Sequence, residues 1–353
     1  MREFGSEYPT VLLPDHYFDS FRQFGKCYWL RSGREALYLV ALNLKSGNKE
    51  SVVLMPAYCC QSMVDPFVKA GWKVVYYRLN KNLTVDTDYL TNLLAKIHPK
   101  AALTMNFYGA ASTAEAVFCI KCGYPECFCI EDFSHCTFSL STILNPLVDY
   151  YVSSIRKSVG VCDGAVIITH LPLDESYVEE SEVKFVNARK RSQKLKADYF
   201  YSQNSENKKV FLSELHCQEE VLDRLSGVHR ISSSGKEMLS ILNGEMIRYA
   251  RKNNMEHILS LLYGKVECIP GIEKCLDGAP FSMPILVKDR DNAQRQLAQK
   301  GVYAPVLWPI CEEARSICSV SARMADEMLS LPIDQRYNYD DIEEIARIVL
   351  ETL

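Results

Sequence analysis

Short apolar runs alternate with amphipathic segments over the first 170 residues, and this alternation limits the possible folds more than any other feature of the chain. The runs are apolar almost throughout, which is typical of strands that are buried on both faces of a sheet. Between them, apolar residues recur at helical spacing, as at Ala36, Leu37, Val40 and Leu44. The pattern predicts an α/β fold, with a mainly parallel sheet covered by helices. We expect strands at residues 51–56, 73–79, 101–109, 127–132, 149–154 and 164–169, and helices at residues 32–45, 62–71, 86–97 and 114–123.

The chain is long enough for two domains. Its 353 residues suit one large domain followed by a smaller one. We place the large domain at residues 1–235 and a small C-terminal α/β domain at residues 236–353. A long helical pattern at residues 235–264, weakened by Gly244, would join the two. In the small domain we expect a strand at residues 281–287 and helices at residues 291–301 and 339–353.

Charge and hydropathy exclude several classes of partner. The formal net charge is −4 at pH 7, so the chain lacks the basic surface that nucleic acid needs. The basic segment 184–200 could meet an anionic substrate, such as a nucleotide diphosphate, or a partner subunit, but a solvated surface helix is the preferred interpretation. Residues 1–18 carry acids and prolines without a long apolar run, which indicates neither a signal peptide nor a membrane anchor. Since no stretch approaches the roughly 20 apolar residues of a membrane span, we expect a soluble cytoplasmic protein.

The 14 cysteines lie mostly in apolar runs, where free thiols act as small hydrophobic side chains. Cys119, Cys122, Cys127 and Cys129 have a spacing that invites a zinc site. However, the first two fall in a helical pattern and the other two bracket a predicted strand, so we expect no metal there. The glycine-rich motifs of dinucleotide and Walker-type phosphate sites are absent as well.

Three features near predicted element ends suggest a chemistry. Asp132 follows an apolar strand, Lys157 follows the next one, and a Ser32–Gly33 turn opens a helix. Ligands in such sheets bind at the carboxyl ends of the strands. Pyridoxal phosphate (PLP) needs an amine for a Schiff base, a carboxylate beside its pyridine nitrogen, and a helix N-terminus for its phosphate. Each feature also has a structural explanation, as a turn residue, a surface lysine or a helix cap.

The order of these motifs resembles a known family. The chain reads SGREAL from residue 32, VVLMPAYCCQSMVDPFVKAGWKVVYY from residue 52 and FYGA from residue 107. It continues with CIEDFSHC from residue 129, SSIRKSVGVCDGAVIIT from residue 153 and LSLPIDQRYNYDDIEEIARIV from residue 329. This ordered set is similar to the DegT/StrS family of PLP-dependent sugar aminotransferases, which have fold type I.

The resemblance implies a role for each matched residue. Lys157 would form the Schiff base and shuttle protons, and Asp132 would pair with the pyridinium nitrogen. His135 stands where the family usually has Gln or His near the ring's 3-oxygen. The groups expected at the phosphate are the backbone N–H groups of Gly33, Arg34 and Glu35 and the hydroxyl of Ser153 or Ser154.

The sequence departs from the family pattern at two of these places. Arg34 replaces the usual threonine of the phosphate turn, and its guanidinium could make a charge-assisted contact instead. Cys60 stands where the family often has an aromatic that stacks on the cofactor, and Tyr58 is the nearest aromatic. The segment 171–210 and the loop near Trp308 are expected to shape substrate choice.

The resemblance also implies an activity. The protein would be a homodimer that moves an amino group from an amino acid such as glutamate to a nucleotide-linked keto sugar, in glycan or surface polysaccharide biosynthesis. One alternative is another PLP reaction, such as sugar dehydration, but that variant typically has His in place of Lys157. A second is a non-catalytic binding or regulatory protein. The presence of Lys157 and Asp132 argues against a non-catalytic role, whereas the departures from the family pattern at Cys60 and Arg34 are compatible with one.

Overall fold

The computed structural model describes residues 4, 17–45, 47, 50–139, 145–202, 204–277 and 279–353. Most of the N-terminal segment 1–18, for which we expect no export signal or anchor, lies outside these residues. No helix in these ranges is both long enough and apolar enough to cross a membrane.

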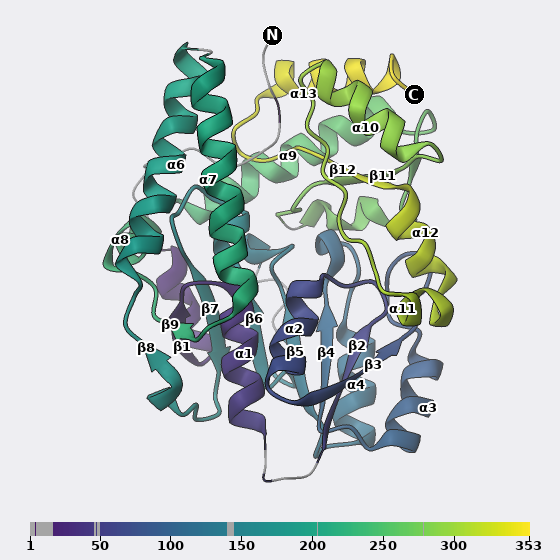
Figure 1. The fold of residues 1–353 in the computed structure, drawn as a ribbon. Coiled ribbons are helices and arrows are strands. Elements are labelled where there is room, and N and C mark those ends of the chain that lie inside the picture. Colours follow the sequence, from purple (N-terminus) through teal and green to yellow (C-terminus); the bar gives the residue numbers. More distant parts are fainter. Residues whose placement is uncertain are drawn as a thin grey trace.

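A seven-stranded sheet forms the centre of the molecule (Figure 1), with the strand order β1-β7-β6-β5-β4-β2-β3. β7 runs antiparallel to both of its neighbours, and the other pairs are parallel. Every residue of β4 and of β7 is buried, as expected for strands covered on both faces. The strands are β1 (Lys26–Leu30), β2 (Ser51–Pro56), β3 (Trp72–Tyr77), β4 (Ala101–Met105), β5 (Phe128–Asp132), β6 (Tyr150–Ser153) and β7 (Ala165–Thr169).

The mainly parallel α/β prediction is therefore confirmed, and all six predicted strands form. β1 was not predicted from the sequence. This strand is only five residues long, lies at the sheet edge and alternates exposed or half-buried residues with buried ones, so it lacks the continuous apolar run of the others.

Four helices accompany the first strands: α1 (Gly33–Leu44), α2 (Gln61–Lys69), α3 (Thr87–Ile97) and α4 (Ala114–Gly123). α1 packs on α2, and α3 packs on α4, so the helices flank the sheet in pairs (Figure 1). The side chain of Ser32 caps α1 by accepting the N–H of Glu35, which confirms the cap that the Ser-Gly pair predicts.

A long helical hairpin follows the sheet (Figure 1). It consists of α6 (Val183–Ser202) and α7 (Ser205–Arg224), and the short strands β8 (Val178–Glu179) and β9 (Val228–His229) pair at its base. The prediction that segment 184–200 is a solvated surface helix is correct for one face of α6 only. Arg189 and Lys196 are only 1% and 2% exposed, because one face of α6 packs on α7.

The C-terminal region contains an antiparallel sheet of β10 (Glu267–Cys268), β11 (Met283–Leu286) and β12 (Met328–Leu331). The predicted strand and both predicted helices form in this region. The single helix predicted at residues 235–264 is instead broken at its glycine. Asn243 caps a new helix that begins at Gly244 and accepts the N–H of Met246. The helices here are α8 (Ser233–Ser240), α9 (Gly244–Leu262), α10 (Arg290–Gln299), α11 (Glu312–Ile317), α12 (Ser319–Glu327) and α13 (Tyr339–Leu350).

Short 3-10 turns connect these elements at Tyr17–Phe24, Phe107–Gly109, Thr137–Ser139, Ile155–Lys157, Glu175–Tyr177 and Ile272–Asp277. The domain boundary between residues 235 and 236 stays a prediction. Within the described part of the chain, no group of three or more His, Cys, Asp or Glu side chains is arranged to hold a metal ion.

Candidate active site

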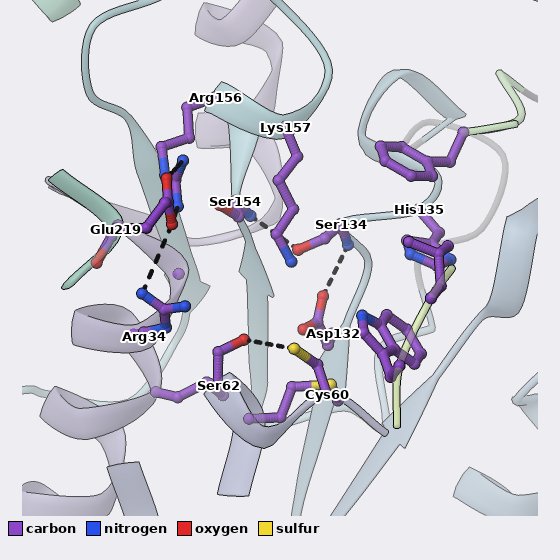
Figure 2. Close-up of a pocket in the computed structure, with 17 residues that line it drawn as sticks. Arg34, Cys60, Ser62, Asp132, Ser134, His135, Ser154, Arg156, Lys157 and Glu219 are labelled. Atoms are coloured by element: carbon purple, nitrogen blue, oxygen red, sulfur yellow. Dashed lines mark hydrogen bonds and ion pairs between the residues drawn. The ribbon is translucent and has the colours of Figure 1, made fainter. Parts of the chain in front are cut away.

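A cavity of about 180 Å³ lies where the ends of β5 and β6 meet the first turn of α1. Figure 2 shows the side chains around it. Because β5 and β6 are neighbouring parallel strands, the residues that follow them come together, as the parallel-sheet rule predicts. Seven of the ten predicted site residues line the cavity: Gly33, Arg34, Cys60, Asp132, His135, Ser154 and Lys157.

Lys157 ends the 3-10 turn that directly follows β6. Its half-buried side chain extends toward Ser134 and Asp132 (Figure 2). Among the residues that the structure describes, no acceptor forms a hydrogen bond or ion pair with its Nζ. The amine is therefore available to react with a carbonyl group in the cavity.

Asp132 ends β5 and is 5% exposed. Its Oδ1 accepts the N–H of Ser134 at 2.8 Å, and Ser134 Oγ accepts the N–H of Ser154 at 2.9 Å. This chain of hydrogen bonds ties the end of β5 to the end of β6. No cation in the described ranges pairs with Asp132, so this buried carboxylate can receive a positively charged group of a ligand.

The preceding residue, Glu131, has a different role. Its Oε2 accepts a hydrogen bond from the Thr113 hydroxyl at 3.0 Å, and the residue does not line the cavity. Burial raises the pKa of Glu131 to about 8, which outweighs the lowering by Thr113. Of the two consecutive acids, Glu131 is thus mostly protonated at neutral pH, and Asp132 is the one at the cavity.

His135 lies between two aromatic rings. Its centroid is 4.7 Å from that of Phe281, with planes at 3°, and 5.3 Å from that of Trp308, with planes at 26°. Its Nδ1 accepts the N–H of Tyr108 at 3.4 Å, which assigns the proton to Nε2. Burial, and then the charge of Lys157, lower the pKa of His135 well below its ordinary value. The ring is therefore neutral and can donate one hydrogen bond.

The first turn of α1 closely approaches β6. A Cβ added to Gly33 would lie 2.9 Å from Ser154 Cβ, so this approach requires glycine. The first N–H groups of a helix have no acceptor within it, and that of Glu35 is taken by Ser32. Gly33 and Arg34 line the cavity, where their N–H groups are available to an anion.

Three predicted residues do not line the cavity: Glu35, Tyr58 and Ser153. The carboxylate of Glu35 is buried against Arg31 and His229. The Tyr58 hydroxyl donates to the Leu307 carbonyl, and its ring packs on Phe107 and Trp308. The Ser153 hydroxyl is 2.7 Å from that of Thr137. These side chains support the walls rather than face the cavity.

Ser134, Arg156, Glu219 and Phe281 are among the lining residues for which no role was predicted from the sequence. Arg156 adjoins Lys157 and Ser134 adjoins His135, so their positions in the sequence were a detectable signal. Glu219 and Phe281 come from distant elements whose patterns do not point to a site. For Trp308, the prediction concerned only the loop around it. Its backbone has a left-handed φ of 83°, a conformation that is rare for a bulky residue and is often found at functional sites.

A charged cluster forms one edge of the cavity. Glu219 of α7 accepts hydrogen bonds from Arg156 at 2.8 and 3.0 Å and from Arg189 at 3.3 Å, and it lies 3.7 Å from Arg34. Burial opposes ionisation of this carboxyl, but the arginines outweigh it and lower the pKa of Glu219 to about 2. Arg34 also pairs with Asp223 at 2.7 Å.

No protein-family model matches the sequence, and no curated protein matches it either. Solved structures do match along nearly the whole chain. Helicobacter pylori PseC, an aminotransferase involved in the biosynthesis of pseudoaminic acid, is 13% identical over 99% of each chain, with a TM-score of 0.67. A DegT/DnrJ/EryC1/StrS aminotransferase from Brucella abortus is 14% identical, covering 96% of this chain and 90% of that chain, with a TM-score of 0.65.

A third match is NtdA from Bacillus subtilis, solved with PMP as its bound cofactor. It is 16% identical, covering 97% of this chain and 78% of that chain, with a TM-score of 0.64. At such low identity the likeness establishes the architecture. The chain therefore has the fold of the DegT/DnrJ/EryC1/StrS aminotransferases, as its sequence resemblance predicts.

Proposed function

We propose that this protein is a PLP-dependent aminotransferase. The observation that carries the proposal is that Lys157, Asp132 and the first turn of α1 line one cavity. Lys157 offers an amine, Asp132 a buried carboxylate, and Gly33 with Arg34 the N-terminus of a helix. These are the three groups that the aldehyde, the pyridine nitrogen and the phosphate of PLP need.

Each residue would have a distinct task. Lys157 would hold the cofactor covalently and would carry the proton of the 1,3-prototropic shift, from the amino-bearing carbon of the substrate to the aldehyde carbon of the cofactor. Asp132, fixed by Ser134, would keep the pyridine nitrogen protonated. Bound there, the cofactor would supply an electron sink for breaking a bond to the amino-bearing carbon. The neutral ring of His135 would donate from Nε2 to the cofactor's ring oxygen.

The remaining lining residues would bind and enclose the cofactor. Gly33 and Arg34 would bind the phosphate through their N–H groups, and Ser154 would add its hydroxyl. Cys60 is half-buried and would contact the ring where the family often has an aromatic. Tyr58 would support this wall through its contact with Trp308.

The substrates are a finer part of the proposal. We infer that an amino acid such as glutamate donates the amino group and that a nucleotide-linked keto sugar accepts it, in glycan or surface polysaccharide biosynthesis. PseC, which shares the fold, is an aminotransferase of pseudoaminic acid biosynthesis, and NtdA binds PMP, the amine form of PLP. The sequence resemblance further supports a homodimer, and we propose that it acts in the cytoplasm.

Cofactor attachment is the first test. The purified chain supplied with PLP should be yellow, and borohydride should fix the cofactor to the peptide that contains Lys157. Lys157→Ala should abolish this labelling, whereas Lys184→Ala, at an exposed position on α6, should not. A colourless wild-type chain that binds no PLP would refute the proposal.

The second test separates transamination from other PLP chemistry. Adding glutamate to the loaded protein should convert the yellow form to the colourless amine form, and a keto acid should reverse the change. If no amino acid changes the spectrum of a protein that does bind PLP, the aminotransferase assignment is wrong and the dehydration alternative gains support.

A further inference from the structure

Three arginines from separate elements converge on one carboxylate beside the cavity. Figure 2 shows two of them, Arg34 and Arg156, beside Glu219. Arg34 lies in the first turn of α1, Arg156 precedes Lys157, and Arg189 belongs to α6. Glu219 accepts two hydrogen bonds from Arg156 and one from Arg189, and it lies 3.7 Å from Arg34.

This arrangement has the chemistry of a phosphate site. Guanidinium groups bind carboxylates and phosphates in the same two-pronged geometry. Arg34 also places the site at the N-terminus of a 12-residue helix, where the helix dipole favours an anion. A phosphate monoester carries a charge of about −1.5 to −2 at neutral pH, which exceeds the charge of the Glu219 carboxylate that the three arginines share. Arg34 also pairs with Asp223, at 2.7 Å.

Building on the proposed function, we propose that Glu219 occupies the place of the cofactor's phosphate, which on binding displaces this carboxylate from Arg34 and Arg156. The side chain of Glu219 thus sets the affinity for phosphorylated ligands. The small volume of the cavity supports this reading. It measures about 180 Å³, with Glu219 in its wall, whereas small-molecule sites usually measure about 300–1,000 Å³.

The hairpin that carries Glu219 packs largely on itself. In the described part of the chain, α6 and α7 make their extensive helix contacts with each other. Their buried apolar residues form two small clusters apart from the main core. One joins Phe185, Val186 and Leu222 with Cys162, and the other consists of Tyr199, Phe211 and Leu215. A displacement of α7 would therefore disturb these small clusters rather than the main core.

Glu219 is also able to leave. Its side chain is 36% exposed, so water can solvate the carboxylate once the arginines release it. It is ionised over the whole physiological range, because the arginines hold its pKa at about 2. The competition is thus between two anions for the same guanidinium groups, and the anion with the greater charge has the advantage.

Glu219→Gln should remove the competitor while keeping the shape of the side chain. We expect the dissociation constant for PLP to fall about tenfold, which is the same free energy as a change of one pKa unit. The arginines lower the pKa of Glu219 by more than this, but solvent screens part of their interaction with a partly exposed carboxyl. The dissociation constant for pyridoxal, which has the same ring and aldehyde without the phosphate, should stay within about twofold. Inorganic phosphate should bind more tightly to the variant in parallel with PLP.

Calorimetric and absorbance titrations of the cofactor-free chain would measure these constants. Glu220→Gln is the matched control, since it removes the same charge from the next residue of α7, where the side chain pairs with His216. If Glu219→Gln leaves the affinities for PLP and phosphate unchanged, weakens them, or strengthens pyridoxal equally, the proposal is wrong. Equal changes in phosphate affinity in Glu219→Gln and Glu220→Gln would also overturn the proposal, because they would show that only the net charge of the chain matters.

A measurement on the wild-type chain tests the displacement itself and does not depend on a variant. Binding of PLP or inorganic phosphate should increase hydrogen–deuterium exchange in peptides covering residues 214–224, while pyridoxal should leave it unchanged. Unchanged or slower exchange with phosphate would contradict the displacement of Glu219.

The two proposals fail in different ways. If the chain binds neither PLP nor pyridoxal, the proposed function is wrong, yet tighter phosphate binding by Glu219→Gln would still support the arginine site. Conversely, phosphate that binds equally well to the PLP-loaded chain would mean that the arginines serve the phosphate of another ligand, and the assignment to the cofactor would be wrong.

Discussion

The ring of His135 lies parallel to that of Phe281, with centroids 4.7 Å apart and planes at 3°. His135 follows β5 of the central sheet, whereas Phe281 precedes β11 of the C-terminal sheet, so this one contact fixes the position of a cavity residue from a distant part of the chain. Trp308 covers the other face of the same imidazole. Aromatic rings therefore cover both faces of the His135 imidazole, and this packing fixes the direction of its Nε2–H.

Phe281→Leu should loosen this arrangement. We expect the free energy of unfolding to fall by about 1 kcal/mol, the usual worth of an aromatic pair beyond its buried area. Cofactor affinity should weaken several-fold, because the Nε2–H of His135 is no longer held in place. Urea unfolding and PLP titration would measure the two effects. Phe118→Leu, at an exposed position on α4, should change neither. Unaltered PLP affinity in the Phe281 variant would show that the stacking does not orient His135.

Asp132→Asn should have opposite effects on the empty protein and on catalysis. The described residues offer Asp132 no cation, so neutralising this buried carboxylate should leave the stability of the cofactor-free chain unchanged or slightly higher. The amide oxygen can still accept the N–H of Ser134. In contrast, kcat should fall at least about a hundredfold, the typical loss when a preorganised electrostatic contact at the reacting group is removed.

Asp149→Asn provides the comparison for Asp132→Asn. Asp149 pairs with Lys121 at 2.8 Å and accepts the N–H of Cys129 at 2.7 Å. Its neutralisation should destabilise the chain by about 1 kcal/mol and leave kcat unchanged. Thermal unfolding without cofactor and steady-state rates would separate the two variants. A clear loss of stability in the cofactor-free Asp132→Asn protein would show that the Asp132 carboxylate already has a stabilising partner in the empty protein, which would contradict its role as a binding group for a cationic ligand.

The sequence predicts the part of the site that depends on local order. Strands with continuous apolar runs are recognisable, and neighbouring parallel strands bring their carboxyl ends together, so the meeting of Asp132 with Lys157 follows from the pattern. The cap at Ser32 is local too, since it spans one helical turn.

The surroundings of these residues depend on long-range packing that no local pattern encodes. Phe281 and Trp308 reach His135 across well over 100 residues, and Glu219 reaches Arg156 from a helix that resembles any charged surface helix. Tyr58 was expected near the cofactor ring by proximity in sequence, but its hydroxyl is drawn to the Leu307 carbonyl and its ring to Trp308. Such tertiary contacts decide whether a side chain points into the cavity or away from it.

The pH dependence of the free energy of unfolding should reveal the raised pKa of Glu131. Burial raises the pKa of Glu131 to about 8 in the folded chain, well above the value of about 4.3 for an unfolded glutamate. Between these values the folded state binds a proton that the unfolded state lacks. Its contribution to stability is fully present below about pH 4.3 and is lost as the pH rises to about 8, with a slope of up to about 1.4 kcal/mol per pH unit.

Glu131→Gln should remove this slope, since the amide stays neutral and can still accept from Thr113. The variant should therefore gain stability over the wild type between pH 5 and about pH 8. Urea unfolding across this range would measure the difference, and Glu126→Gln, at an exposed position, should leave the wild-type profile unchanged. Parallel profiles for wild type and Glu131→Gln would show that Glu131 titrates alike in both states.

Gly33→Ala tests the close approach between α1 and β6. The added Cβ would lie 2.9 Å from Ser154 Cβ, an atom fixed to the backbone, so α1 must shift. Overpacking of this kind costs about 1–3 kcal/mol. Cofactor binding should weaken as well, because Gly33 and Arg34, whose N–H groups would bind the phosphate, line the cavity. Gly123→Ala is the matched control, since its added Cβ would meet nothing within 4 Å.

The clash also has a specific rescue. Ser154→Gly removes the atom that an alanine at Gly33 would strike, so the double variant should recover much of the stability that Gly33→Ala loses. A double-mutant cycle from urea unfolding gives the interaction free energy directly, and residues in contact typically couple by about 0.5–3 kcal/mol. If the two effects simply add, the loss in Gly33→Ala arises from the backbone of the first turn of α1 and not from its packing on Ser154.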